Sequence, residues 1–411
     1  MLHVVKQLLH RPLMPMLVVL QVALACAIAC NAAFLLQQKL SLILARTGVP
    51  NPSHLLVLSQ IVPQGDPWST AQLQTVEAEM HAVPGVSSVS YAAAFPMASS
   101  LSIRAHVYGE GQRARVSAAV YMGDNLLKTL GSNLEDGRNF TQGEESVIVG
   151  DDMGLHTGGP VIITRALADQ LFPGGHALGR VIHFAYGSHT GGTRTVVGVV
   201  SHLIRSRLDD SGRGYDDAML FPGLAAQWPM PLFAVRITRP DAVLVCKSLM
   251  RVVDSTLGAR LLPGNPPRCD SFASLRDSVL AQPRAAVWLL SGVTLIVLLV
   301  TLAGVMGMTR YWVQQRTRSI GIKRALGARR GDVQRELLIE NLLVMGAGVA
   351  VGMIAAYGIN LWLMWHYELS RLPWIYLPTG AVLLIVLGQL AVLAPTRHAA
   401  RVPPVAAMRG I

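Results

Sequence analysis

Four long apolar stretches constrain this chain more than any other feature of its sequence. They cover residues 13–36, 285–309, 337–365 and 374–395. A helix crosses a bilayer with about 20 apolar residues, and a spanning segment must satisfy its own backbone hydrogen bonds. Each stretch therefore predicts a transmembrane helix. The spans are arranged as one plus three, with a long polar block, residues 37–283, between the first and the second.

Two alternatives for the first stretch remain open. It could be a cleaved signal peptide, because Lys6 and Arg11 precede it and small residues follow, or a lipoprotein signal that ends at Cys30. The apolar run is longer than a usual signal core, however, and the residues before Cys26 and Cys30 lack a good lipobox leucine. These features favour an uncleaved anchor. Cys26 and Cys30 lie four apart on the span and would face lipid or a neighbouring helix.

The net charge of +11 is placed beside the spans and not in the polar block. Residues 37–283 hold twenty basic and twenty acidic residues, so the excess flanks the apolar stretches. The positive-inside rule then makes residues 1–12, 310–336 and 396–411 cytoplasmic, and the polar block and the 366–373 loop external. A nucleic-acid-binding domain would need a basic face on a folded domain, so no nucleic-acid partner is expected. The basic flanks predict contact with membrane lipids.

The polar block predicts an α+β domain of two lobes, which makes the whole chain an α+β membrane protein. Strand–helix–strand patterns occur at both ends of the block, with Ser69 as an expected helix N-cap. We expect one lobe from about 50–110 with 228–283, and an inserted lobe at about 111–227. The expected strands and helices cover residues 54–62, 69–83, 86–93, 146–150, 161–164, 165–172, 181–186, 193–200, 231–237 and 241–257.

No catalytic or cofactor motif is found in the sequence. HExxH and GxSxG are absent, and no lysine follows a glycine, which excludes a Walker A loop within these residues. We therefore expect no catalytic residue, metal site or cofactor in this chain. The acidic pairs Asp151-Asp152 and Asp209-Asp210 are expected to be solvated. Cys246 and Cys269 both fall in the external block, where a disulfide is chemically allowed, but sequence does not supply the geometry.

The segment between the second and third spans has the most informative pattern. Ile322 and Leu326 are four apart, so on a helix they share a face. Gly327 would permit a helix end or a close approach, and Asp332 could cap the next helix. A basic amphipathic helix at the inner face of the membrane could rest on anionic lipid or dock on a protein. Glu340, the acid at the edge of the third span, is expected to be interfacial.

This segment resembles the signature of MacB/FtsX-type ABC transporter permeases. The matching residues are Arg316-Thr317-Arg318, Ile320-Gly321-Ile322, Arg324-Ala325-Leu326-Gly327-Ala328 and Leu338-Ile339-Glu340, with Leu171-Phe172-Pro173-Gly174, Leu178-Gly179 and Val196-Val197-Gly198-Val199-Val200 in the external block. The one-plus-three order of spans matches as well. Ser319 stands where the family usually has glutamate.

The resemblance implies a MacB-like periplasmic core domain at 37–283 and an FtsX-like permease domain at 284–411. It also implies a coupling helix that docks on an ATP-binding cassette ATPase subunit. That helix is formed by Ser319, Ile320, Gly321, Ile322, Lys323, Arg324, Ala325, Leu326, Gly327 and Ala328. ATP and magnesium would be bound by the partner ATPase, on another chain, since only about 12 residues precede the first span.

In that family two permeases pair, and ATP-driven motion passes through the spans to the external domain, which is called mechanotransmission. The resemblance implies export of peptides, antibiotics or other amphipathic compounds at the bacterial inner membrane, with a periplasmic adaptor and an outer-membrane channel as further partners. A lipoprotein-releasing permease is the alternative within the family, and a membrane-anchored sensor or scaffold is the alternative of another class. Gly348 and Gly352 form a GxxxG pair that suits close helix packing, including packing in a homo- or heterodimer.

Overall fold

The computed structural model describes residues 13–98, 103–109, 115–145, 148–149, 158–186, 189–208, 214–238, 241–367 and 373–400. The chain forms two compact units. The first, called the helical unit, consists of Met1–Ser41 with Pro283–Ile411, and the second, called the external unit, consists of Leu42–Gln282. Each is described by itself. Several features discussed above lie outside the described residues, namely residues 1–12, residues 146, 147 and 150 of the expected strand 146–150, the pairs Asp151-Asp152 and Asp209-Asp210, residues 368–372 and residues 401–411.

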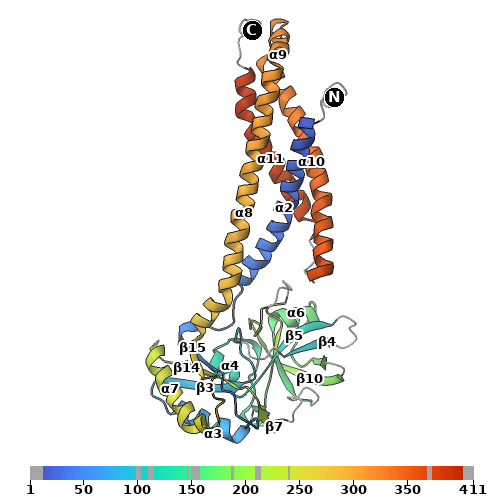
Figure 1. Cartoon of the computed structure of the whole chain (residues 1–411). Coiled ribbons are helices and arrows are strands. Elements are labelled where there is room, and N and C mark those ends of the chain that lie inside the picture. Colours follow the sequence, from blue (N-terminus) through green and yellow to red (C-terminus); the bar gives the residue numbers. More distant parts are fainter. Residues whose placement is uncertain are drawn as a thin grey trace. The chain divides into compact units, whose positions relative to one another are not determined.

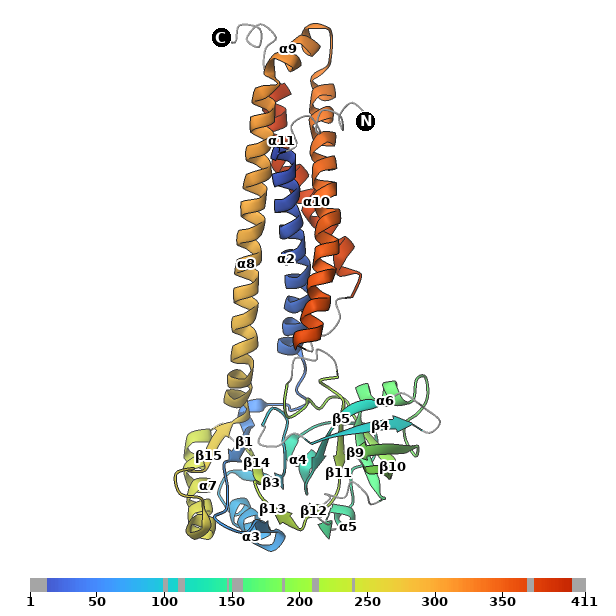
Figure 2. The same ribbon diagram turned by 45° about the vertical axis from the view of Figure 1, so that its right-hand side comes forward.

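Four helices of the first unit are long and apolar enough to cross a membrane. They are α2 (Leu13–Leu44), α8 (Phe272–Gln315), α10 (Arg330–Tyr367) and α11 (Tyr376–Ala400), and a short helix, α9 (Thr317–Ala325), joins α8 to α10 (Figure 1). Figure 2 shows α8 as the longest of them. Three of these helices extend beyond their expected spans, because the apolar run marks only the part that lipid requires. The fourth, α11, begins two residues later than expected and ends five residues later. The helix of α8 continues through Pro283, where the sequence had suggested a boundary.

The GxxxG pair of α10 packs against α2 within the chain. A Cβ atom added to Gly348 would lie 2.8 Å from Cβ of Val22, and one added to Gly352 would lie 2.6 Å from Cβ of Cys26. Only glycine allows this approach. The pair is therefore used for packing inside the helical unit, and it gives no separate support to dimerisation. Cys26 and Cys30 are fully buried and face neighbouring helices.

Gly352→Val should separate α10 from α2 and destabilise the helical unit. An inserted side chain in a packed interface costs about 1–3 kcal/mol. The matched control is Gly358→Val, in the same helix, because nothing lies within 4 Å of a Cβ at Gly358. Thermal unfolding of the purified full chain in detergent should show a lower midpoint for Gly352→Val only. Equal midpoints for the two variants would show that this contact carries no stability.

The first sheet of the external unit is antiparallel and has the order β15-β1-β14-β3. Its strands are β1 (Leu55–Ser59), β3 (Val86–Ala92), β14 (Leu232–Ile237) and β15 (Arg268–Ser271), and its helices are α3 (Thr70–His81) and α7 (Ala242–Leu257). The expected cap of α3 is present: the Gln72 N–H donates to Ser69 Oγ, and Gln72 Oε1 accepts from the Ser69 N–H. This capping box fixes where the helix begins. Its apolar face buries Leu73, Val76 and Met80.

Cys246 of α7 and Cys269 of β15 are joined by a disulfide, with their Cα atoms 5.8 Å apart. β15 is an edge strand of the first sheet, and it runs directly into α8, which begins at Phe272. The bond therefore ties the edge strand to the helix that covers the sheet. Edge strands have one free side, and a covalent tie limits their loss from the sheet.

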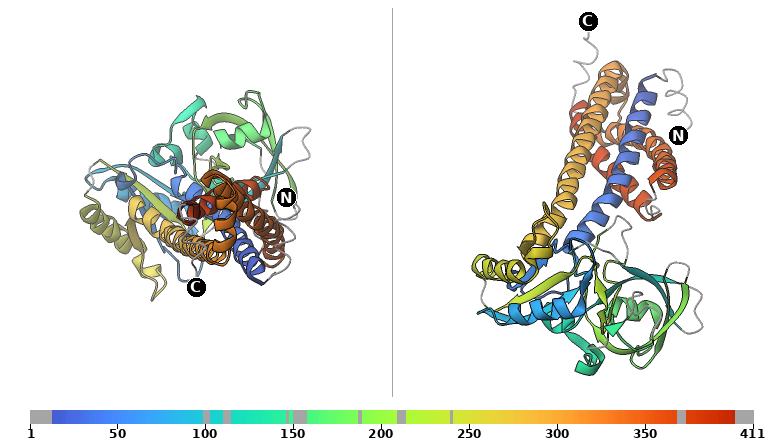
Figure 3. Two further views of the ribbon diagram at one scale, coloured as in Figure 1. Left: turned by 90° about the horizontal axis from the view of Figure 1, so that it is seen from above. Right: turned by 60° about the horizontal axis from the view of Figure 1, so that its bottom comes forward.

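The second sheet closes on itself. Its order is β6-β10-β8-β11-β5-β4-β9, and β9 also pairs with β10. The strands are β4 (Arg104–Gly109), β5 (Val116–Met122), β6 (Leu134–Gly137), β8 (Pro160–Thr164), β9 (Val181–Tyr186), β10 (His189–Val200) and β11 (Ala218–Phe221). Figure 3 shows these strands arranged in a ring. Closure removes most of the free edges that an open sheet would expose.

Smaller elements complete the external unit. They are η1 (Pro52–His54), β2 (Trp68–Ser69), α4 (Leu126–Leu130), α5 (Gln142–Glu145), β7 (Ile148–Val149), α6 (Arg165–Leu171), β12 (Leu224–Ala225), β13 (Gln227–Trp228) and η2 (Gly258–Arg260). The pairings β2–β13 and β7–β12 form two further short ladders.

The expected boundary of the inserted lobe at 111 is too late. β4 falls before it, yet it pairs with β5 and β9 of the second sheet and with no strand of the first. The physical reason is the hairpin of β4 and β5, which places both strands in the same sheet. The two lobes are also less separate than the sequence suggested, because two buried apolar clusters each include side chains from both sheets.

An acidic cluster lies in the external unit, and the sequence did not predict it. Glu77 of α3 interacts with Asp124, which follows β5, and with Glu145 of α5. Burial and the neighbouring Asp124 raise the pKa of Glu77 to about 9, and burial followed by Asp124 raises the pKa of Glu145 to about 7. Burial also raises the pKa of Asp124. Both effects favour the protonated carboxyl group over the carboxylate.

The cluster predicts that stability falls as the pH rises. Because the folded pKa of Glu77, about 9, is above its ordinary value, the folded state binds protons more tightly than the unfolded state. The stabilisation is complete below about pH 4.5 and is lost as the pH rises through about 9. We expect a lower unfolding midpoint of the full chain at pH 8.5 than at pH 5.5. Glu77→Gln should reduce this difference, and Asp169→Asn, an exposed change on α6, should not. An unchanged difference in Glu77→Gln would contradict the assignment.

Candidate functional site: the α9 segment

A short helix between α8 and α10 holds the residues that the sequence singled out. α9 (Thr317–Ala325) is fixed by Ile320, which is buried against Val313, Val333 and Leu337. Gly321 beside it is also buried. One face of α9 is therefore packed on α8 and α10 of the same unit, and α9 cannot turn without breaking this contact.

Gly327 ends the helix and does not serve a close approach. Its φ is +100°, a conformation that favours glycine, and no heavy atom lies within 4 Å of a Cβ added there. The Ala328 N–H donates to the Lys323 carbonyl at 3.1 Å, as in a Schellman cap. The expected coupling helix, which ran to Ala328, is thus too long: its last residues form the cap and not a further turn.

Asp332 lies in the first turn of α10 and not at the N-cap position, but its side chain still stabilises the start of the helix. Its Oδ2 accepts a hydrogen bond from the Arg329 N–H at 2.9 Å, and α10 starts at Arg330. A carboxylate in the first turn that reaches back in this way satisfies one of the free N–H groups and interacts favourably with the helix dipole. Gly327 and Asp332 together produce a tight connection between two antiparallel helices.

Glu340, at the start of the third apolar stretch, is buried and paired, a contact that the sequence did not predict. Only 1% of its side chain is exposed, and Arg316 Nη1 donates to both of its carboxylate oxygens, at 2.8 and 2.7 Å. A charge this deeply buried is stable only with a partner. A second pair, between Lys323 Nζ and Glu336 at 2.8 Å, is half-exposed. The first pair connects the start of the segment to α10, and the second connects the last turn of α9 to α10.

The sequence contained a signal for these pairs that a search within single helices missed. If residues 327 to 329 form the turn of a helical hairpin, partners lie at equal distances before and after it. Arg316 with Glu340 and Ile320 with Leu337 follow this symmetry to within one residue, whereas Lys323 and Glu336 lie four residues before and seven residues after the turn. The ion-pair partners were overlooked because helical spacing was considered within each helix and not across the turn.

The other face of α9 presents apolar side chains that nothing in the described chain covers. Ile322 is 47% exposed and Leu326 is 84% exposed. The side chains of Ser319, Lys323 and Ala325 are exposed on the same helix. We call Ser319, Ile322, Lys323 and Leu326 the docking face. Exposed large apolar side chains on a rigid helix, rimmed by polar groups, are typical of a protein contact or a membrane contact.

Comparison with known proteins identifies the class of protein that has this arrangement. Residues 36–245 match the MacB-like periplasmic core domain, and residues 291–404 match the FtsX-like permease C-terminal domain. The chain belongs to this family of ABC transporter permeases. It is a multi-pass membrane protein with an α+β domain of the periplasmic type between its first and second apolar helices.

The relatives have longer chains. The "Macrolide export ATP-binding/permease protein MacB" of Chromobacterium violaceum is 28% identical over 308 residues, which is 71% of this chain and 43% of that protein. The protein of the same description from Hyphomonas neptunium is 37% identical over 145 residues, which is 33% of this chain and 21% of the relative. This chain therefore spans less than half the length of these relatives.

The periplasmic region of MacB from Actinobacillus actinomycetemcomitans is a solved structure that also matches. The TM-score is 0.36 at 14% identity, over 58% of this chain and 97% of the other.

Proposed function

We propose that this chain is the permease part of a MacB-type ABC exporter. An ATP-binding cassette unit binds and hydrolyses ATP with magnesium, and it docks on the docking face of α9. Its motion passes through α8 and α10 to the external domain, which moves the substrate by mechanotransmission. Residues 1–411 contain no Walker A motif, so ATP is bound outside them.

One observation carries this proposal: an exposed apolar pair on a helix that is held rigidly by its other face. Ile322 and Leu326 are exposed, while Ile320 and the pair of Arg316 with Glu340 fix α9 to α8 and α10. A partner that pushes on α9 would therefore move two membrane-crossing helices with it. A helix that merely rested on lipid would not need a buried ion pair at its base.

The orientation and the further partners follow from the proposal. Basic residues of 310–336 place α9 on the cytoplasmic side, with both termini, and the external unit on the periplasmic side. A second permease, a periplasmic adaptor and an outer-membrane channel would complete the assembly. The names of the relatives support export of a macrolide or another amphipathic compound.

The test is purification of the tagged native protein in mild detergent, followed by mass spectrometry and an ATP hydrolysis assay. The proposal expects a stoichiometric ATP-binding subunit and ATP hydrolysis in the eluted complex. If the chain elutes alone, even after cross-linking in intact membranes, the permease proposal fails. A membrane-anchored sensor, which needs no ATPase, would then be the better explanation.

A further inference from the structure

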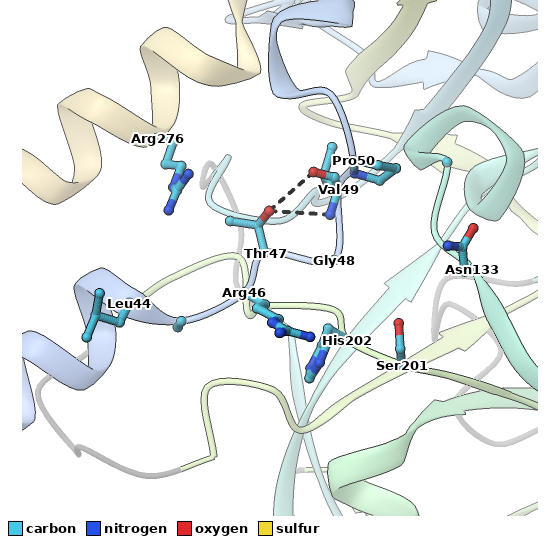
Figure 4. A pocket seen from close by; sticks show the side chains of 12 residues that line it. Leu44, Arg46, Thr47, Gly48, Val49, Pro50, Asn133, Ser201, His202 and Arg276 are labelled. Atoms are coloured by element: carbon cyan, nitrogen blue, oxygen red, sulfur yellow. Dashed lines mark hydrogen bonds between the residues drawn. The ribbon is translucent and has the colours of Figure 1, made fainter.

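A cavity in the external unit lies directly after α2 and is independent of the α9 site. It has a volume of about 500 Å³ and is lined by residues 44–50, by Gly131 and Asn133, by Ser201 and His202, and by Arg276 of α8. All of these residues belong to the same compact unit. Figure 4 shows Arg276 on one side of the cavity, with Arg46 and His202 across from it.

The lining carries positive charge and no negative charge. Arg46, Arg276 and His202 are its ionisable residues, and no carboxylate lines it. The Arg276 Nε atom is buried without a hydrogen-bond partner among the described residues. Within that same part of the chain, neither Arg46 nor Arg276 forms an ion pair. A buried donor without an acceptor is costly, and a ligand that supplies an acceptor removes the cost.

The histidine of the cavity wall is bonded by a carboxylate. Asp216, which does not line this cavity, bonds His202 Nδ1 at 2.5 Å through Oδ2 and accepts from the Leu203 N–H at 2.7 Å through Oδ1. It therefore holds the imidazole in place, and it forms no ion pair with Arg46, beside which it lines a neighbouring hollow. The Ser201 hydroxyl and the Asn133 amide add two uncharged polar groups to the wall.

The wall formed by residues 44–50 is fixed by local contacts. Gly48 has a φ of +77°, and a Cβ there would overlap the His202 carbonyl. The Ser132 hydroxyl donates to the Gly48 carbonyl at 2.8 Å. The Thr47 hydroxyl accepts from the Val49 N–H at 3.3 Å, as Figure 4 shows. The segment is thus held against the domain, and the cavity is a defined feature of the fold.

The chain itself places both arginines near the membrane surface. Arg46 follows the apolar stretch 13–36 by ten residues, and Arg276 precedes the stretch 285–309 by nine. At about 1.5 Å per residue, a helix covers this separation in roughly 15 Å. Apolar side chains of the lining, such as Leu44 and Val49, could contact the less polar part of a ligand.

We propose that this cavity binds the anionic oxygen group, phosphate or carboxylate, of a ligand at the membrane surface. Arg46 and Arg276 supply charge-assisted hydrogen bonds from two sides, and Ser201 and Asn133 supply neutral ones. The anion comes from a lipid headgroup or from a free oxyanion in the periplasm. The proposal goes beyond the proposed transport function and does not depend on it.

The test measures binding to the full chain in a neutral detergent, by native mass spectrometry. The probes are short-chain phosphatidylglycerol, the diacylglycerol that lacks its phosphate, and glycerol phosphate. We expect phosphatidylglycerol to bind and diacylglycerol not to bind. Glycerol phosphate separates the sources: binding shows that a free oxyanion suffices, and no binding assigns the site to a lipid headgroup.

Variants connect the binding to the cavity. Arg46→Gln and Arg276→Gln should each weaken binding about tenfold, because each removes one charge-assisted bond. Arg46→Lys should retain part of the affinity, and Arg251→Gln, on the exposed side of α7, should change nothing. Arg46 is exposed, so its substitution tests the site without disturbing the fold. Equal binding of phosphatidylglycerol and diacylglycerol, or full affinity in Arg46→Gln, would overturn the proposal.

Discussion

Leu326→Asp should weaken the association of this protein with its ATP-binding unit by about 100-fold and leave the fold intact. The side chain is 84% exposed, so the folded chain gains nothing from its burial and loses little on substitution. In a docked complex the same side chain would enter an apolar groove. An aspartate there is desolvated without a partner, and central contacts of this kind are worth about 2–4 kcal/mol.

The measurement is titration of the purified chain with the ATP-binding unit found by co-purification. Val243→Asp is the matched control, because Val243 is 74% exposed on α7 of the external unit and undergoes the same chemical change. Circular dichroism and the unfolding midpoint check that each variant is folded. Unchanged association in Leu326→Asp would show that the docking face is not the contact, and would favour the sensor explanation.

Arg316→Ala should destabilise the helical unit by about 3–5 kcal/mol, the largest effect expected for a single substitution at this site. Glu340 is only 1% exposed and has its carboxylate held by Arg316. Removal of the arginine leaves a buried negative charge without a partner. The cost is that of the isolated charge and exceeds the net contribution of the intact pair.

The double variant Arg316→Ala with Glu340→Gln should recover part of the loss, because a neutral amide replaces the unpaired carboxylate. Lys323→Ala is the control on the neighbouring pair, which is 49% and 40% exposed and should contribute less than about 1 kcal/mol. Detergent unfolding curves give the stability of each variant and of the unaltered chain. If Arg316→Ala and Lys323→Ala lowered the stability by equally small amounts, the buried pair would not be the anchor of α9.

Ser319, which stands where the family usually has glutamate, lies outside the contacts that hold α9 in place. Neither ion pair described at this site involves position 319, and the Ser319 side chain is exposed. On a helix, Ser319 lies on the same side as Ile322 and Leu326. The serine in place of the family's usual glutamate therefore lies on the exposed side of α9 and takes no part in the two ion pairs that anchor this helix.

Local signals in the sequence predicted most of the individual elements. Apolar length identified the four membrane helices, and Ser69 predicted the start of α3. These features depend on residues close together in the chain, or on the single requirement of burial in lipid. The ends of the helices were predicted less exactly. The helix α8, for example, continues through Pro283, where the sequence had suggested a boundary.

Features that depend on distant residues were not predicted. The pairing of β9 with β10, which closes the second sheet, and the placement of β4 follow from tertiary contacts that no local pattern records. The same is true of Glu340, since its partner Arg316 lies on the other side of the hairpin turn. At the candidate site, the sequence therefore singled out the exposed residues of α9, whose docking role stays a prediction, but not the contacts that hold this helix.

Site-specific photocrosslinking from α9 in native membranes tests the central claim most directly. A photoreactive amino acid replaces Leu326, and a second variant carries it in place of Arg251 on α7 as a control. The account predicts that position 326 is cross-linked to a protein with a Walker A motif, that position 251 is not, and that Ile322→Asp in the same chain reduces the yield. Cross-links from position 326 to lipid alone, with none to a nucleotide-binding protein, would contradict it.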